Sequence, residues 1–132
     1  MSNSEQALRA AQRPPERYAQ VQPPRIVTDD DVDKALAFLR DSAKQLGAAK
    51  QRTMEKESLV KRTKALVMRM HSDKSLGAAE REAILDPRYA EAEAEEAVAY
   101  GEFETLRALR DAAAAKIECW RSEQATYRSM KL

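Results

Sequence analysis

Arginines recur in two stretches of the chain at spacings that suit contacts with successive phosphates. Arg52, Arg62 and Arg69 lie ten and seven residues apart, and Arg121 and Arg128 lie seven apart. In a helix, we expect each set to stay on one side, turned away from any partner helix. A line of guanidinium groups can neutralise a phosphate backbone. The two rows are therefore candidate contacts for a nucleic acid.

Apolar and aromatic side chains accompany both rows. Tyr127 is next to Arg128, and an aromatic ring can stack on an unpaired base, which favours a single strand. Leu59 and Leu66 fall among the arginines of the first row. The alternative interpretation is an ordinary solvated helix face, with these two leucines buried in an oligomer.

Signatures of catalysis and of metal binding are missing from the sequence. It has no phosphate-cradling glycine loop, no nucleophile elbow and no helical histidine-glutamate metal motif. The single histidine, His71, falls at a predicted helix end, where a capping role is usual. Cys119 lies beside Trp120 and has no histidine partner, which favours a packed thiol over a nucleophile. We expect no enzymatic activity, no cofactor and no metal.

Residues 29–71 predict one long helix. The stretch has no proline and a single glycine, Gly47, and Thr28 and Asp31 have the spacing of a capping box at its start. Apolar or small residues follow one side at spacings of three and four. This predicted stripe consists of Val32, Leu36, Leu39, Ala43, Leu46, Ala49, Thr53, Val60, Val67 and Met70.

Two further helices are predicted after a polar break. Residues 76–85 suit a short helix, and Asp86 followed by Pro87 is a strong start signal for a second long helix over residues 87–130. Its predicted stripe consists of Tyr89, Ala92, Ala99, Phe103, Leu106, Leu109, Ala113, Ile117 and Trp120.

The first 27 residues predict a disordered arm that precedes a hairpin domain of residues 28–132. Proline pairs at 14–15 and 23–24 prevent a continuous helix through the arm and favour extended chain. Its arginines leave the arm slightly positive, so it is either a solvated tail or a contact for phosphates or a protein.

The composition agrees with a small all-α protein. The chain has 132 residues, 34% of them charged and 5% aromatic, with a net charge of +1 and one cysteine. So few large side chains make a thin core, which leads us to expect a homo-oligomer. No stretch resembles a membrane span or a signal segment, and a lone cysteine suits a reducing compartment, so we expect a cytoplasmic protein.

The two long helices are expected to pair antiparallel, with the chain reversing near residues 76–80. That register places Arg69 near Arg88, Thr53 near Glu104 and Leu36 near Trp120. It also brings the basic part of the first helix, including Lys50, Lys61 and Lys64, to the acidic run between Glu91 and Glu104. Such pairing sets orientation and register more than stability.

The run from Ala113 to Arg128, with its Trp120-Arg121 pair followed by Ala125 and Arg128, resembles the end of small two-helix proteins of tailed phages. The Lys-x-x-Lys-Ala-Leu pattern at residues 61–66 is similar to the same group. These proteins in turn resemble the UvsY-type recombination mediators.

The resemblance implies an oligomeric helical protein that binds single-stranded DNA and helps to load a recombinase or annealing protein on DNA held by a single-strand-binding protein. It places Lys61, Arg62 and Lys64 in the basic segment of the family, and Trp120, Arg121 and Arg128 in its C-terminal motif. The acidic second helix departs from the family, so tight DNA binding would need several linked subunits. The alternative function is a structural or adaptor coiled coil of a virion or of host takeover, with protein partners only.

Overall fold

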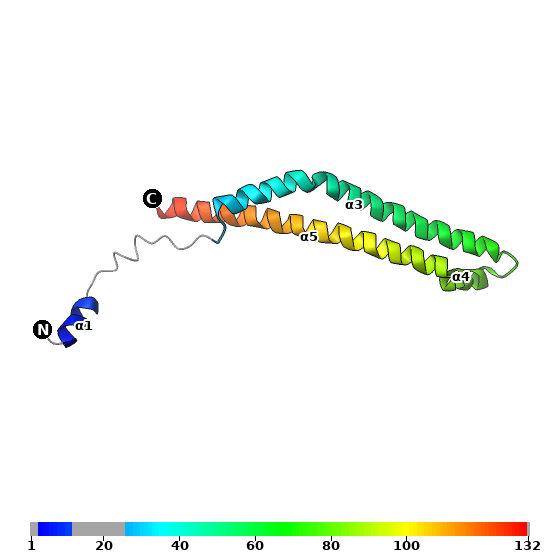
Figure 1. Ribbon diagram of the computed structural model, residues 1–132, viewed down its shortest axis with the longest axis horizontal. Coiled ribbons are helices and arrows are strands. Elements are labelled where there is room, and N and C mark those ends of the chain that lie inside the picture. The colour runs from blue at the N-terminus through cyan, green and yellow to red at the C-terminus, as the bar shows by residue number, and fades with distance from the viewer. Residues whose placement is uncertain (1–2, 12–25, 132) are drawn as a thin grey trace.

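The computed structural model describes residues 3–11 and 26–131, and the second of these segments is an all-α hairpin, which confirms the predicted fold class (Figure 1). Helix α3, Asp29–Met70, lies antiparallel to α5, Pro87–Met130. The short helix α4, Leu76–Leu85, packs against both of them at the closed end. The three hairpin helices therefore begin and end within one residue of the predicted bounds.

One helix was not predicted. Helix α1 spans Asn3–Ala11, inside the expected arm, with Glu5 in its first turn and Arg9 in its last, which complements the helix dipole. The proline pairs that excluded a continuous helix come later, within residues 12–25, and therefore outside the described residues. Their effect does not reach back to Asn3–Ala11.

The start of α3 is fixed by its own side chains and by α5. The hydroxyl of Thr28 accepts the Asp31 amide at 3.1 Å and the Asp31 carboxylate accepts the Thr28 amide at 3.0 Å, which is the predicted capping box. Val27 and Val32 are both buried, in the positions of a hydrophobic staple. The Ile26 amide donates to Glu123 at 3.1 Å. Ile26 and Val27, which the prediction placed in the arm, are therefore tied to the hairpin.

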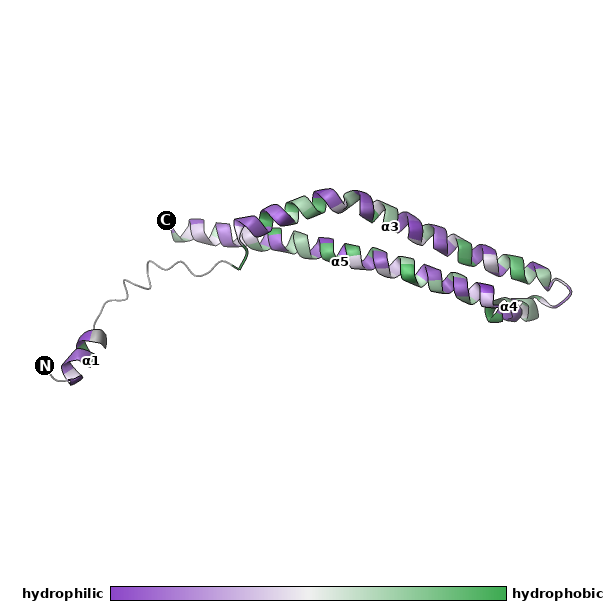
Figure 2. Cartoon of the chain, in the orientation of Figure 1, coloured by the Kyte–Doolittle hydropathy of each residue, from purple (hydrophilic) through white to green (hydrophobic). Residues whose placement is uncertain are grey.

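The seam between α3 and α5 follows a strict alternation of three-residue and four-residue steps, as in a two-stranded coiled coil. On α3, the buried or half-buried seam positions are Val32, Ala35, Leu39, Ser42, Leu46, Ala49, Thr53, Lys56, Val60, Thr63 and Val67. On α5 they are Ala92, Glu96, Ala99, Phe103, Leu106, Arg110, Ala113, Ile117 and Trp120. Apolar and polar residues accordingly alternate along both helices without a continuous apolar band (Figure 2).

Part of the predicted stripe lies outside this seam. Leu36, Ala43 and Met70 are exposed, as is Leu109 on α5. The predicted stripe included only apolar or small residues, even where they departed from a regular spacing. The observed seam keeps a regular spacing and therefore includes polar residues such as Ser42 and Lys56. In this hairpin, the period decides which residues face the partner helix.

Small side chains let the two backbones approach closely. Ala49, Ala92 and Ala99 are buried, and Val67 is the largest fully buried side chain of the described residues. The Thr53 hydroxyl lies 3.3 Å from the Ala99 carbonyl oxygen across the seam, and 3.0 Å from the Ala49 carbonyl oxygen. Such a contact requires a small residue at each facing position.

The predicted register is wrong by one to two helical turns over most of the seam. Thr53 lies against Ala99 instead of Glu104, and Trp120 lies against Asp29 instead of Leu36. The chain reverses at residues 71–75, before α4, and α4 then folds back along α3. Because an antiparallel register moves by twice the displacement of the turn, an error of a few residues in the turn shifts the whole pairing. Only near Arg88, whose guanidinium lies 3.3 Å from the Met70 sulfur, does the pairing stay close to the prediction.

Enlarging a seam alanine should destabilise the hairpin. Ala99→Leu adds a branched side chain where the Ala99 carbonyl approaches Thr53, so we expect the free energy of unfolding to fall by about 1 to 3 kcal/mol. Urea denaturation measures it, with Ala97→Leu on the exposed side of α5 as the control. An equal loss in both variants would contradict a close-packed seam.

The start of α5 should respond to acid. Asp86 caps α5, and its pKa is lowered to about 2 because it accepts hydrogen bonds from the Arg88 guanidinium, and secondarily from the Arg88 amide. The charged form therefore stabilises the folded state above the usual pKa of about 4, and this contribution is lost as the pH falls from about 4 to about 2.

We expect Asp86→Asn, which can still cap, to lose less helicity than the parent chain over this pH window. Far-UV circular dichroism during an acid titration measures the difference. Identical titration curves for the two chains would show that the Asp86 charge does not stabilise α5.

Candidate nucleic-acid interface

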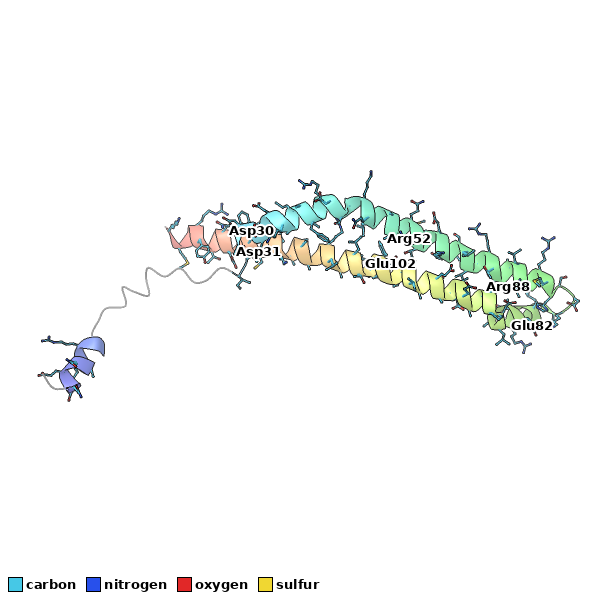
Figure 3. The ribbon with its side chains drawn as sticks, viewed as in Figure 1. Asp30, Asp31, Arg52, Glu82, Arg88 and Glu102 are labelled. Carbon is cyan, nitrogen blue, oxygen red and sulfur yellow. The ribbon has the colours of Figure 1, made fainter. Side chains whose placement is uncertain are left out.

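Arg52 does not belong to the predicted first row. Its guanidinium lies 2.8 Å from the Glu102 carboxylate, and the two side chains approach each other from α3 and α5 (Figure 3). Ten residues at about 100° each leave Arg52 and Arg62 about 80° apart, whereas the seven-residue step to Arg69 leaves only about 20°. The prediction that all three turn away from the seam is wrong for Arg52.

Arg62 and Arg69 form a two-residue row on the outer side of α3. Both are exposed, and neither makes an ion pair within the described part of the chain. Arg62 donates only weakly, from Nε to the Ser58 carbonyl oxygen at 3.5 Å. Both guanidinium groups can therefore meet an anion from solvent.

The lysines nearby have other partners. Lys61 pairs with Glu57 of its own helix at 3.5 Å. Lys64 pairs with Glu80 of α4 at 2.8 Å, a hydrogen bond that raises the pKa of Lys64 and lowers that of Glu80. Lys50 lies 6.0 Å from the centre of the Phe103 ring. The expectation that acids of the second long helix neutralise Lys50, Lys61 and Lys64 is therefore wrong.

The predicted pairing of a basic α3 with an acidic α5 is nevertheless present, through other residues. Arg52 pairs with Glu102, and Lys56 pairs with Glu95 at 2.9 Å. The four side chains are between 33% and 55% exposed, so each pair adds little stability. Their main effect is to fix which residues of the two helices face each other.

Trp120 ties the two helices together near the open end of the hairpin. Its side chain is half-buried, and the indole nitrogen donates to the Asp29 carboxylate at 2.8 Å. Tyr127 is half-buried two turns farther along the same side of α5. Trp120 therefore has a structural role in the seam, whereas Tyr127 lies beyond the start of α3.

The C-terminal part of α5 carries a groove of about 600 Å³. It lies where α5 continues past the start of α3 (Figure 1). Trp120, Arg121, Gln124 and Arg128 line it, together with Glu118, Ser122 and Ala125. We call it the Trp120 groove. It combines two guanidinium groups, an amide and an aromatic side chain.

The arginines of the Trp120 groove are lightly constrained. Arg121 lies 3.1 Å from Glu118, an exposed pair within one helix, and Arg128 makes no ion pair with the described residues. An exposed pair of this kind is worth less than about 1 kcal/mol and yields readily to a phosphate. The groove can therefore offer two cations to a polyanion.

The structure keeps the two arginine rows apart. Arg88 lies at the level of Met70, and Arg121 lies 33 residues beyond Arg88 on the same straight helix. At 1.5 Å per residue, about 50 Å separate the Trp120 groove from the Arg62 and Arg69 row. Of the nine predicted residues, Arg62 and Arg69 thus lie on one surface and Trp120, Arg121 and Arg128 line the other. Arg52, Lys61 and Lys64 are held in ion pairs, and Tyr127 does not line the groove.

Sequence reasoning missed Arg110, which crosses the seam. One of its guanidinium nitrogens donates to the Leu39 carbonyl oxygen and to the buried Ser42 hydroxyl, both at 2.7 Å. The signal was its spacing, since Arg110 stands four residues after Leu106 and three before Ala113 in the strict seam pattern. Its role is to position α3 on α5.

The remaining reactive groups of the described residues do not gather. Cys119 is half-buried, with its sulfur 3.8 Å from a Glu123 oxygen, and His71 caps the end of α3 through its backbone. In the described segments, no group of three or more acidic, histidine or cysteine side chains is placed to hold a metal ion. No helix there is long and apolar enough to cross a membrane.

The fold and the site define an antiparallel helical hairpin protein with a small polar groove near its open end. Comparisons of the chain with protein-family models, with curated proteins and with solved structures each gave no match. Inference about function therefore depends on the geometry and on the sequence resemblance.

Removing the indole hydrogen bond should destabilise the hairpin. Trp120→Phe keeps the ring in the seam but loses the donor to Asp29, so we expect the free energy of unfolding to fall by about 1 kcal/mol. The same substitution in an Asp29→Ala background should cost almost nothing more, and urea denaturation of the four chains measures the coupling. Additive losses would show that the two side chains do not interact in solution.

Proposed function

We propose that this chain is a non-enzymatic accessory protein of phage-type DNA recombination, which binds single-stranded DNA and helps to load a recombinase or annealing protein. The observation that carries the DNA-binding part is the Trp120 groove, where two arginines without strong partners lie beside an aromatic ring and an amide. The recombination setting comes from the resemblance of residues 113–128 to phage proteins.

The groove suits a single strand better than a duplex. Its aromatic side chain and its amide can meet an unpaired base, while Arg121 and Arg128, two turns apart on α5, can meet the backbone. No array of cationic side chains surrounds these two arginines, because most lysines and arginines of the hairpin face carboxylates. The affinity of one hairpin for DNA is therefore expected to be modest, and several linked hairpins would bind more tightly.

A protein-binding adaptor is the second candidate function, favoured by the closed end of the hairpin. Large apolar side chains there are strongly exposed, namely Met70, Leu76, Ile84 and Leu85. Such a surface suits a protein partner and has no use in binding DNA. An adaptor would show no affinity for oligonucleotides.

A titration with a fluorescent oligothymidine, at about 50 and 200 mM salt, tests the proposal. We expect binding that weakens steeply with salt, because each phosphate that the protein neutralises contributes about -0.7 to the slope of log K against log salt for a single strand. Arg121→Glu with Arg128→Glu should weaken binding on the order of tenfold or more and leave helicity unchanged. The matched control is Arg40→Glu with Lys44→Glu, the same charge change on an exposed part of α3.

The variants also separate the two surfaces. Arg62→Glu with Arg69→Glu should affect binding no more than the control pair, because these residues lie about 50 Å from the Trp120 groove. If all three double variants weaken binding equally, the net charge and not the groove governs the affinity. An absence of binding at low salt would leave the adaptor as the better function.

A further inference from the structure

A second groove runs between α3 and α5 in the half of the hairpin nearer the closed end, on the side where Arg52 meets Glu102. Two adjoining hollows of about 530 and 310 Å³ form it, and both are lined by Glu91 and Glu95. We call it the Leu59 groove. At its base lie the buried seam residues Ala92 and Ala99.

The sides of the Leu59 groove are apolar and open to solvent. Leu59 and Leu66 stand on α3, and Ala94 and Val98 stand on α5. Leu66 is 61% exposed and Val98 is 63% exposed, although each stands next to a buried part of the seam. Both helices therefore carry apolar side chains that their own pairing leaves uncovered.

We propose that the Leu59 groove is covered by the Leu59 groove of a second copy of this chain. The two copies form a four-helix arrangement about a two-fold axis parallel to the helices, in which α3 of each copy packs on α5 of the other. Every helix then lies between two antiparallel neighbours, and the closed ends of both hairpins point the same way. Because this axis keeps each residue at its own level, Leu59 of one copy meets Ala94 of the other. Leu66 then lies at the level of the other copy's Arg88, and Val98 at the level of its Arg52 and Lys56.

Charge selects the second copy as the occupant and also selects this arrangement. The α3 side of the groove carries Arg52 and Lys56, and the α5 side carries Glu91, Glu95 and Glu102. Packing α3 on α3, or α5 on α5, would bring like charges together. Only α3 on the second copy's α5 opposes bases to acids, so the groove is complementary to itself.

The direction of the axis follows from the order of the charges along the groove. With the axis parallel to the helices, Arg52 lies at the level of the second copy's Glu102, as it does within its own hairpin. An axis perpendicular to the helices would reverse the levels and pack α3 on the second copy's α3 and α5 on its α5, so that the glutamates of the two α5 helices would face each other. The closed ends are therefore expected to lie together.

This interface is separate from the proposed DNA site, and its test needs no DNA. Sedimentation or light scattering of the full chain should give a dimer. Leu59→Glu with Val98→Glu should raise the dissociation constant on the order of a hundredfold or more, because two apolar contacts per copy are lost. Leu36→Glu with Met54→Glu, at exposed apolar positions outside the groove, should leave the dimer intact.

Energy transfer tests the orientation independently of these variants. In a Cys119→Ser chain, dyes on Ser129→Cys should show efficient transfer within the dimer, because the open ends lie together. If the closed ends of the two copies pointed in opposite directions, no transfer would occur. Residue 129 is about 34 residues from the middle of the groove, so the two dyes would then lie on the order of 100 Å apart.

A monomeric parent chain, a dimer that survives the Leu59 and Val98 changes, or a dimer without energy transfer would each overturn the proposal. Far-UV circular dichroism checks that the substituted chains keep their helicity. If the Leu59 and Val98 variant loses its helicity, energy transfer in the unsubstituted groove still decides.

Discussion

The hairpin depends on a close approach of two backbones along a seam of small residues. Ala49, Ala92 and Ala99 bring α3 and α5 near enough for the Thr53 hydroxyl to reach a carbonyl oxygen of the opposite helix. Larger seam residues would hold the helices apart and break this contact. The same choice of residues limits how much apolar area the pairing can bury, so the hairpin is held as much by directional polar contacts as by its core.

Those polar contacts decide the register. The seam positions repeat every seven residues on both helices, so a shift of seven residues would preserve their period. Arg110, with its two acceptors Leu39 and Ser42, fits only one alignment, as do Trp120 with Asp29 at the open end and Lys56 with Glu95 nearer the closed end. A hairpin built mainly from helix periodicity thus obtains a unique structure from a few polar side chains placed inside its seam.

Local signals predicted the helices well, because each boundary is a short-range event. Thr28 with Asp31, and Asp86 with Pro87, determine helix starts from within four residues of sequence. The register of α3 against α5 could not be predicted from such local signals, because it depends on whether the chain turns before or after α4. An error of a few residues in the position of the turn shifts the paired residues by twice that number. Arg52 shows the same limit, because its partner Glu102 is 50 residues away.

Electrostatic pairing also explains why so few cations are available to an outside ligand. The chain has 23 bases and 22 acids, and the long helices place many of them opposite each other. Arg62, Arg69 and Arg128 are exceptions, since none of them makes an ion pair within the described residues. A nearly neutral chain of this kind gains no general attraction to DNA, so the proposed binding of a single strand depends on where these few groups stand.

The arrangement of copies then matters for function. One Trp120 groove offers two guanidinium groups, too few for strong binding at moderate salt. Two hairpins joined with their closed ends together would carry their Trp120 grooves at one end, where a strand held by the first groove stays close to the second. The second contact becomes intramolecular, and its effective concentration is set by the distance between the grooves. The exposed apolar surface near Leu59 and Val98 would then join two DNA sites in one dimer. Two linked sites would compensate for the weak attraction that a nearly neutral chain has for DNA.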